Sequence, residues 1–210
     1  MAKNNLSVSI LIAYLKHYGV RKLVLSPGTR NIPFVTAVEG DPFFECYSVV
    51  DERNAAFFAL GLSQKSGEPV GLACTSGTAV SNYLTGLSEA YYSHAPIVAI
   101  TCDRSPYVLG QLETQKVDQR GALESAVKKS IELPVLKDID DVWYFERLLN
   151  EGLIALRQGL PGPVHFNMPL VGDTNALWDE GSRKKVESSM KFIDFVDLHD
   201  EAGFAAKREC

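Results

Sequence analysis

The sequence lacks the features that would assign it to several common classes of protein. It has no run of basic residues and its formal net charge is −5, so the charge pattern of a nucleic-acid-binding protein is missing. Its longest apolar runs are too short to cross a bilayer. The first residues, MAKNNLSVSIL, have no signal-peptide cleavage region and are typical of the start of a soluble helix. We therefore expect no nucleic-acid partner and no membrane span.

Cysteine and histidine are too scattered to form a disulfide framework or a metal centre. The four cysteines, Cys46, Cys74, Cys102 and Cys210, make no CxxC pair. Three of them lie in or at the ends of apolar strand-like segments, which is typical of buried free thiols in a cytosolic protein. The four histidines show no metal-ligand spacing. We expect a cytoplasmic protein, and no metal site made by this chain alone.

Strand-like and helix-like segments alternate along the chain. Its 210 residues, 46% of them hydrophobic, suit one domain or one domain plus part of another. Apolar strands are expected at 22–26, 44–50, 69–75, 95–103, 131–136 and 162–170. Helices are expected at 5–18, from after the SPGTRNIP turn to about residue 38, and at 51–67, 76–94, 121–130 and 141–159. This alternation predicts an α/β fold, with a mostly parallel β-sheet and helices on both faces.

The character of the chain changes after about residue 177. Residues 178–210 contain charged segments and only one weakly apolar stretch, KFIDFV. We interpret residues 1–174 as one domain and residues 175–210 as a linker with the truncated start of the next domain.

Polar clusters follow four of the predicted strands. They are SPGTR (26–30), DERN (51–54), TSGT (75–78) and CDRSP (102–106). In an open parallel sheet, ligands bind outside the carboxyl ends of the strands. No Walker A loop and no GxGxxG motif occurs. The convergence of the four clusters at one edge therefore indicates a ligand site more strongly than any single motif.

Each cluster also has a purely structural explanation. Asp51 is a good N-cap and Glu52 suits the first turn of a helix, while serine and threonine in TSGT are usual helix caps. Arg30 is harder to explain, because a cation in the first helical turn opposes the helix dipole, and we expect it to meet an anion. Arg104 follows a strand end and is either another anion ligand or an ordinary surface arginine.

The helix after Glu52 is unusually small and apolar. Alanines at positions 55, 56 and 59 leave room for close approach of another helix, and Phe57 and Phe58 could desolvate the carboxylate. A desolvated carboxyl has a raised pKa, so it can stay protonated and donate a hydrogen bond. We therefore favour a functional role for Glu52. The alanine face also leads us to expect self-association through this helix as a two-fold dimer.

In their order and spacing, SPGTR, DERNAAFFALG, TSGTAVSNYLTGLSEAYYSH, CDRSP and ETQKVDQ resemble the N-terminal pyrimidine-binding (Pyr) domain of thiamine-diphosphate enzymes. The resemblance covers about residues 5–170. Within that superfamily the chain is most similar to MenD-type synthases of menaquinone biosynthesis. These transferases decarboxylate 2-oxoglutarate and add the succinyl carbanion to isochorismate. The sequence departs from the common pattern at Thr29, Asn54 and Ser105, where serine, serine and proline are frequent.

The resemblance implies roles for individual residues. The glutamate that matches Glu52 hydrogen-bonds the aminopyrimidine ring of thiamine diphosphate and favours its imino tautomer, which makes it catalytic. Arginine suits the carboxylates of isochorismate because its fork bonds both oxygens. By the same matching, the cofactor-binding residues are Glu52, Thr75, Ser76, Gly77 and Asn82, and the substrate-binding residues are Thr29, Arg30, Arg104 and Gln115, with Gln115 also catalytic.

One part of a thiamine enzyme is missing from the sequence. Such enzymes hold the diphosphate and Mg²⁺ or Mn²⁺ with a Gly-Asp-Gly motif and a downstream asparagine pair, and this chain has no such combination. We expect an inactive fragment whose full-length enzyme is a homodimer or homotetramer acting on 2-oxoglutarate and isochorismate. Two alternatives stay open. One is the α subunit of a two-chain thiamine-diphosphate-dependent 2-oxoacid decarboxylase, and the other is a non-catalytic α/β binding module.

Overall fold

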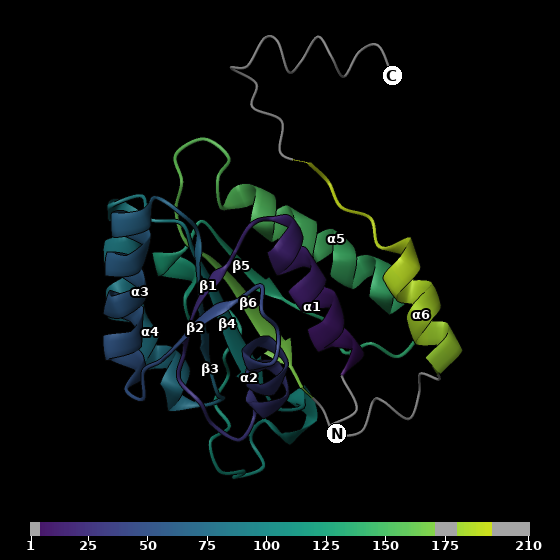
Figure 1. Cartoon of the computed structure of the whole chain (residues 1–210). Helices are drawn as coiled ribbons and strands as arrows, with labels where there is room; N and C mark the ends of the chain where they lie inside the picture. Colours follow the sequence, from purple (N-terminus) through teal and green to yellow (C-terminus); the bar gives the residue numbers. More distant parts are fainter. Residues whose placement is uncertain (1–4, 171–179, 195–210) are drawn as a thin grey trace, which may run out of the picture.

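The computed structural model describes residues 5–170 and 180–194, which form one sheet covered by helices (Figure 1). All six strands are parallel, in the order β2-β1-β3-β4-β6-β5. The strands are β1 (Lys22–Leu25), β2 (Glu45–Ser48), β3 (Val70–Cys74), β4 (Ile97–Asp103), β5 (Lys129–Glu132) and β6 (Val164–Pro169). The predicted α/β fold with a mostly parallel sheet is confirmed, and every strand pair is parallel.

Helices cover both faces of the sheet (Figure 1). They are α1 (Leu6–His17), α2 (Ile32–Glu39), α3 (Glu52–Ser66), α4 (Thr78–Tyr92), α5 (Ile139–Ala155) and α6 (Glu180–Ser189), with 3₁₀ turns η1 (Pro106–Val108) and η2 (Glu124–Ala126). Leu23 and Leu25 point into the apolar cluster under α1, α2 and α5, whereas Val24 points into the cluster under α3 and α4. This alternation follows from the period of two of a β-strand. It divides the core into two layers.

Helices α3 and α4 pack very closely against each other. Ala55, Ala56 and Ala59 are completely buried, and a Cβ added to Gly86 of α4 would lie 2.6 Å from the Cβ of Ala56. The close approach that the alanines predict is therefore made within the chain. The expectation that this face is free for a second copy is wrong. The outer face of α3 instead carries Phe57 and Phe58, which are 46% and 44% exposed.

The segment 121–130 differs from the helix that the sequence predicts. Only the short turn η2 forms there, and the chain then enters β5 at Lys129, two residues before the expected strand. Pairing with β6 overrides helix propensity, because Lys128 N donates to Pro163 O at 2.7 Å just ahead of the parallel ladder. The strand ends before Pro134, which has no N–H to donate.

Helix α6 and the residues after it pack against the domain. Val186 is buried, and the carbonyl oxygen of Lys191 accepts hydrogen bonds from Tyr14 Oη and Asn150 Nδ2, each at 2.8 Å. Tyr18 Oη donates to Ile193 O at 2.6 Å. Part of the segment interpreted as a linker is thus helical and attached to α1 and α5. The boundary at residue 174 stays a prediction, and residues 175–179 and 195–210 lie outside the described residues.

The contact between α3 and α4 can be tested with two glycines. Gly86→Ala should lower the free energy of unfolding by about 1–3 kcal/mol, because the new methyl group would overlap Ala56. Gly61→Ala is the matched control. Nothing lies within 4 Å of a Cβ added to this exposed helical residue, so the variant should gain about 0.5–1 kcal/mol. Urea unfolding measures both values, and equal effects at the two sites would contradict the packing described.

Candidate functional site

The strand order creates a topological switch point at the carboxyl edge of the sheet, between β1 and β3. After β1 the chain crosses to β2 on one side, and after β2 it returns to β3 on the other side of β1. The loops that follow β1 and β3 therefore leave the sheet in opposite directions. In α/β proteins ligands bind at such a switch point. The predicted clusters at 26–30 and 75–78 lie on its two sides, and the cluster at 51–54 follows β2.

The loop after β1 is held tightly against the loop after β3. A Cβ added to Gly28 would lie 2.6 Å from the Cβ of Thr75, and Arg30 N donates to Thr75 Oγ1 at 3.2 Å. The side chain of Asn31 closes the turn, since its Oδ1 accepts from Gly28 N at 2.7 Å and its Nδ2 donates to Ser26 O at 2.9 Å. These bonds fix the backbone at Arg30, while Thr29 stays exposed.

Glu52 is the first residue of α3 and is half-buried. Asp51 caps the helix, because its Oδ1 accepts from Asn54 N at 2.8 Å, as the sequence predicts. The segment between β2 and α3 is joined to the loop after β1, because Ser26 Oγ donates to Val49 O at 2.8 Å. Phe58 lies against Tyr47, with ring centroids 5.4 Å apart. The phenylalanines of α3 are exposed and leave Glu52 only partly shielded from solvent.

Two buried hydroxyl groups that follow β3 are without hydrogen bonds in the described residues. Ser76 Oγ and Tyr83 Oη have no partner of normal geometry among the described residues, although Tyr83 lies beside Cys74 and Ser26. Burial holds the pKa of Tyr83 well above its usual value, and the Cys74 thiol and the Glu52 carboxylate add to that effect. Tyr83 is therefore a neutral donor. Unpaired buried hydroxyls are rare, which indicates that a ligand or water satisfies them.

The turn Thr75–Gly77 is buried and touches a distant loop. Gly77 has φ +87°, and a Cβ added there would lie 3.0 Å from the carbonyl oxygen of Gln115. Only glycine fits this close approach with a left-handed φ. Gln115 itself has φ +55°, which is uncommon for a residue other than glycine, and its side chain is exposed. The loop carrying Gln115 is thus pressed onto the turn after β3.

Arg104 is bound to the same loop. Its Nη1 donates to Thr114 O at 2.6 Å, and its Nη2 forms an ion pair with the Glu113 carboxylate. The structure therefore brings together Arg104, the Gln115 loop and the turn Thr75–Gly77. It does not bring Asn82 to them in the same way. Asn82 lies one turn along α4, is exposed, and donates to Thr78 O at 3.4 Å.

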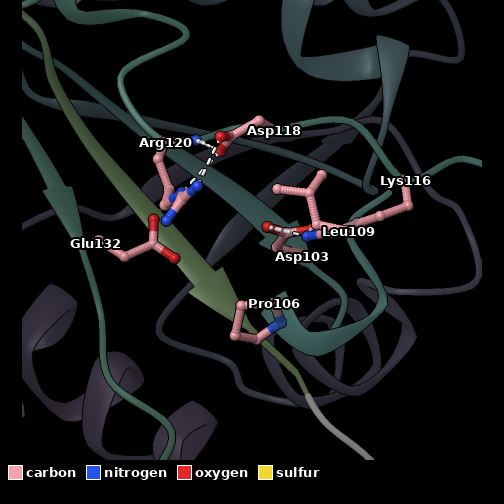
Figure 2. Close-up of a pocket in the computed structure, with 7 residues that line it drawn as sticks. All are labelled: Asp103, Pro106, Leu109, Lys116, Asp118, Arg120 and Glu132. Carbon is pink, nitrogen blue, oxygen red and sulfur yellow. Dashed lines mark hydrogen bonds and ion pairs between the residues drawn. The ribbon is translucent and has the colours of Figure 1, made fainter. Parts of the chain in front are cut away.

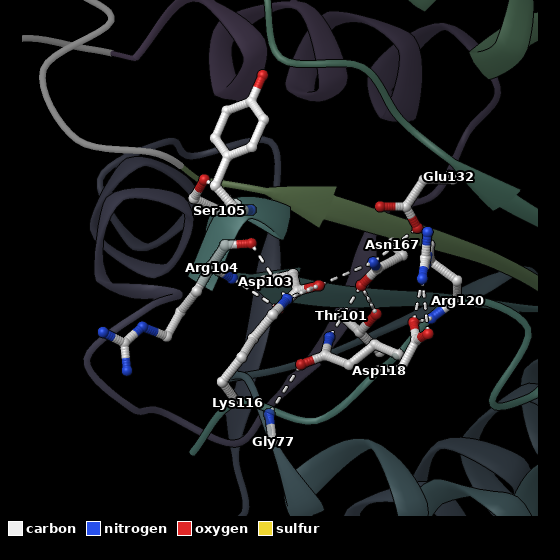
Figure 3. A network of polar contacts seen from close by, with 12 residues as sticks. Gly77, Thr101, Asp103, Arg104, Ser105, Lys116, Asp118, Arg120, Glu132 and Asn167 are labelled. Carbon is white, nitrogen blue, oxygen red and sulfur yellow. Dashed lines mark hydrogen bonds and ion pairs between the residues drawn. The ribbon is translucent and has the colours of Figure 1, made fainter. Parts of the chain in front are cut away.

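Polar side chains that were not predicted from the sequence lie on one face of three neighbouring strands, and Figure 3 labels Thr101, Asp103, Glu132 and Asn167 among them. They are Thr101 and Asp103 on β4, His165 and Asn167 on β6, and Ser130 and Glu132 on β5. Each pair is two residues apart, so both members face the same side of the sheet. That period-two pattern within otherwise apolar strands was the available signal. On this face Lys116 and Gln119, from the loop after β4, bond to these side chains.

Asp103 forms a buried ion pair with Lys116, another residue that the sequence analysis did not single out. Lys116 Nζ lies 2.9 and 3.0 Å from the two carboxylate oxygens, and the side chains are only 4% and 5% exposed. A small cavity of about 40 Å³ adjoins the pair, lined also by Asp118, Arg120 and Glu132 (Figure 2). Its volume suits water rather than a cofactor.

Some components of a cofactor site are not found in the described residues. They contain no cluster of three or more histidine, cysteine or acidic side chains that could hold a metal ion. Cys46, Cys74 and Cys102 are free thiols. None of the described helices combines the length and the apolar character that a membrane crossing requires.

Comparison with known families defines the class. The model described as "Thiamine pyrophosphate enzyme, N-terminal TPP binding domain" matches residues 7–122, and the chain belongs to this family. The resemblance to a Pyr domain is thereby confirmed.

The chain is similar to proteins named 2-succinyl-5-enolpyruvyl-6-hydroxy-3-cyclohexene-1-carboxylate synthase. It is 46% identical over 160 residues to that of Bacteroides fragilis, covering 76% of this chain and 29% of the relative. For Porphyromonas gingivalis the identity is 44% over 173 residues, covering 80% and 30%. For Geobacillus kaustophilus it is 38% over 179 residues, covering 85% and 31%. The chain thus spans about 30% of the length of these relatives.

The buried His165 should make stability depend on pH. Burial lowers its pKa to about 4, whereas an unfolded histidine titrates near about 6.5. Between these values the unfolded chain binds a proton that the folded chain does not. The free energy of unfolding should therefore fall as the pH drops from about 6.5 to about 4, by roughly 3 kcal/mol in all.

Urea unfolding across this pH range measures the effect. His165→Gln should flatten the pH dependence, whereas His17→Gln, at an exposed position, should leave most of it. The comparison concerns slopes rather than absolute stabilities, because His165→Gln also changes hydrogen bonds. An unchanged slope in His165→Gln would rule out the assignment to this residue.

Proposed function

We propose that this chain forms the N-terminal part of a thiamine-diphosphate-dependent synthase that decarboxylates 2-oxoglutarate and adds the succinyl group to isochorismate. The observation that carries the proposal is the position of Glu52. It opens α3 at the carboxyl edge of the sheet, close enough to the buried hydroxyl of Tyr83 to raise its pKa. The names and identities of the relatives favour this synthase over the two-chain decarboxylase and the non-catalytic module.

The residues at the switch point suit the pyrimidine end of the cofactor. Glu52 would hydrogen-bond a ring nitrogen and control its protonation, and the turn Thr75–Gly77 would pack beside the ring, with Asn82 nearby. Ser76 Oγ supports this fit, because it is a buried polar atom still open to a partner. Thiamine diphosphate, when bound, supplies the nucleophile and the electron sink for decarboxylation. The protein supplies orientation, proton control and exclusion of water.

The diphosphate end requires ligands of another kind. Magnesium or manganese bound to a diphosphate prefers carboxylate and carbonyl oxygens. The described residues offer no cluster of side chains suited to that role. We therefore assign the metal and the diphosphate to a different domain of the full-length synthase, which the greater length of the relatives allows.

Arg30 and Arg104 supply positive charge for a substrate with several carboxylates. The backbone of Arg30 is fixed by Thr75, and the guanidinium of Arg104 is held against the loop 113–119 by Thr114 O and Glu113. Thr29 precedes Arg30 in the sequence, and Gln115 follows Thr114, whose carbonyl oxygen accepts from Arg104; both side chains are exposed. We assign all four residues to the binding of isochorismate, with Gln115 also placed for the catalytic step.

The outer surface of α3 and α4 is suited to contact with a second copy of the chain. That surface exposes a set of large apolar side chains: Phe57, Phe58, Leu84, Tyr91 and Tyr92. Exposed apolar patches mark interaction surfaces. We propose that a second copy covers this patch, in place of the alanine face first expected. Contact there would also complete the shielding of Glu52, because Phe57 and Phe58 lie on the same helix. A cytoplasmic location stays a prediction.

Glu52→Gln in the full-length synthase should reduce turnover by roughly 10²–10⁴-fold, the usual size of a proton-transfer contribution. The amide keeps the shape of the side chain but cannot exchange a proton in the same way. The thermal midpoint should hardly change, because Glu52 is half-buried and Asp51 still caps the helix. Glu39→Gln, on the exposed end of α2, is the control. Turnover near that of the unmodified enzyme would exclude this role.

Arg30→Ala and Arg104→Ala should impair the two half-reactions unequally. Loss of a charge-assisted hydrogen bond costs about 1.5–3 kcal/mol, so the use of isochorismate should weaken roughly tenfold to over a hundredfold. Release of carbon dioxide from 2-oxoglutarate alone should change much less. Arg147→Ala, on the exposed face of α5, is the matched control. Equal losses in both assays would mean that the arginines are structural.

A further inference from the structure

We propose that Asp103–Lys116 and Gln119–Asn167 form a buried clamp that holds the loop 113–119 against the turn Thr75–Gly77 and so positions Arg104 and Gln115 beside that turn. The clamp residues are positioning residues and would not touch substrate or cofactor. The purpose assigned to the clamp rests on the function proposed for Arg104 and Gln115. Its existence rests only on the contacts described below (Figure 3).

Asn167 is the centre of the clamp, and all its hydrogen-bonding capacity is used. Its Nδ2 donates to Glu132 Oε2 at 2.7 Å and to Asp103 Oδ2 at 3.2 Å. Its Oδ1 accepts from Gln119 Nε2 at 2.9 Å and from Thr101 Oγ1 at 2.8 Å. The Asp103 carboxylate, which is paired with Lys116, leaves the amide only one orientation, because a carboxylate oxygen cannot donate. The direction of every bond to Asn167 is therefore determined.

Gln119 connects Asn167 to the turn after β3. It is completely buried, and because its Nε2 donates to Asn167, its Oε1 must face the other way. That oxygen accepts from Gly77 N at 2.8 Å. Gly77 in turn is in close contact with the backbone of Gln115. One buried amide thus joins the end of β6, the turn that begins α4 and the loop that carries a proposed substrate ligand.

The far side of Asn167 is equally determined. The single hydroxyl hydrogen of Thr101 points to Asn167 Oδ1, so the 2.7 Å contact with His165 must be donated by His165 Nε2. His165 Nδ1 is then an acceptor for Ser130 Oγ at 2.9 Å. This requires a neutral ring, in agreement with the lowered pKa of His165. The sheet therefore presents Asn167 in one fixed orientation.

The ion pair of Asp103 with Lys116 joins the end of β4 to the loop 113–119. Arg104 follows Asp103, and Gln115 precedes Lys116. Asp103 Oδ1 accepts from Arg104 N at 2.7 Å, and Lys116 Nζ also approaches Arg104 O at 3.4 Å. A buried ion pair adds little stability relative to a well-packed apolar pair, but removal of one partner is costly. Its role here is geometric. Arg104 and Gln115, the two residues assigned to the substrate, each stand next to one member of the ion pair and are held in place by it.

Amide hydrogen exchange on the 210-residue chain tests whether the clamp exists. Gln119→Ala should speed exchange at the Gly77 amide roughly tenfold to a hundredfold, because its acceptor is removed. Lys116→Met should do the same at the amide of residue 116, which donates to Glu113 O. Amides in the centre of β3 should keep their rates. Lys184→Met, which breaks an exposed ion pair with Glu180, is the matched control and should change none of them.

Gln119→Glu separates the two ends of the clamp. The carboxylate could still accept from Gly77, but it could not donate to Asn167 Oδ1. Without that second bond the side chain is no longer held in place, so exchange at Gly77 should again increase. Uniformly faster exchange across the whole sheet would show that the residues only stabilise the fold, and unchanged exchange would refute the clamp outright. Should Gln119→Ala fail to fold, Gln119→Glu and Lys116→Met still decide the question.

Kinetics in the full-length synthase test what the clamp is for. Lys116→Met should raise KM for isochorismate roughly tenfold, with a smaller change in kcat for decarboxylation of 2-oxoglutarate. Combined with Arg104→Ala it should have little further effect, since both changes remove the same contact. Additive losses would overturn the positioning role. Loss of the proposed function itself would appear differently, as an unmodified protein without synthase activity whose exchange results still support the clamp.

Discussion

Parallel strand pairing is the constraint on which the rest of this structure depends. All five strand pairs are parallel, so each connection must carry the chain back across the sheet before the next strand begins. The returning helices cover both faces, and the polar segments that follow the strands gather at the carboxyl edge. The order β2-β1-β3 then separates the loops after β1 and β3, and the contact of Gly28 with Thr75 lies between them. The candidate site is thus a consequence of topology before any particular side chain is considered.

The main elements and the position of Glu52 could be predicted because their signals are local. Strands β3 and β4 are buried at every residue, so they appear in the sequence as continuous apolar runs. Glu52 needed only the recognition of one strand followed by one helix. The capping role of Asp51 was visible for the same reason. Motif order added the family, because the four polar clusters occur at a characteristic spacing.

The features that the sequence did not reveal depend on partners far apart in the chain. The alanines of α3 indicated close packing, but only the fold identifies Gly86 as the partner. Residues 129 and 130 looked helical, yet they pair with β6. The polar residues of β4, β5 and β6 had a visible period of two. Their meaning depended on the order β4-β6-β5, which places Asn167 between Thr101 and Glu132.

The site combines a region in which polar groups are saturated with one in which they are not. Asn167 uses all its hydrogen-bonding capacity, and Gln119 is bonded through both amide atoms. By contrast, the hydroxyls of Ser76 and Tyr83 have no hydrogen-bond partner among the described residues. Unpaired buried groups are costly, so they persist where something else will bind them.

The two regions meet at the turn Thr75–Gly77. The N–H of Gly77 belongs to the saturated network, whereas the neighbouring Ser76 hydroxyl is free of it. The network therefore restrains the turn through the backbone of Gly77, and the side chain of Ser76 remains open to a ligand. An active site benefits from this division, because groups that bind a cofactor must be held in place without being used up by the bonds that hold them.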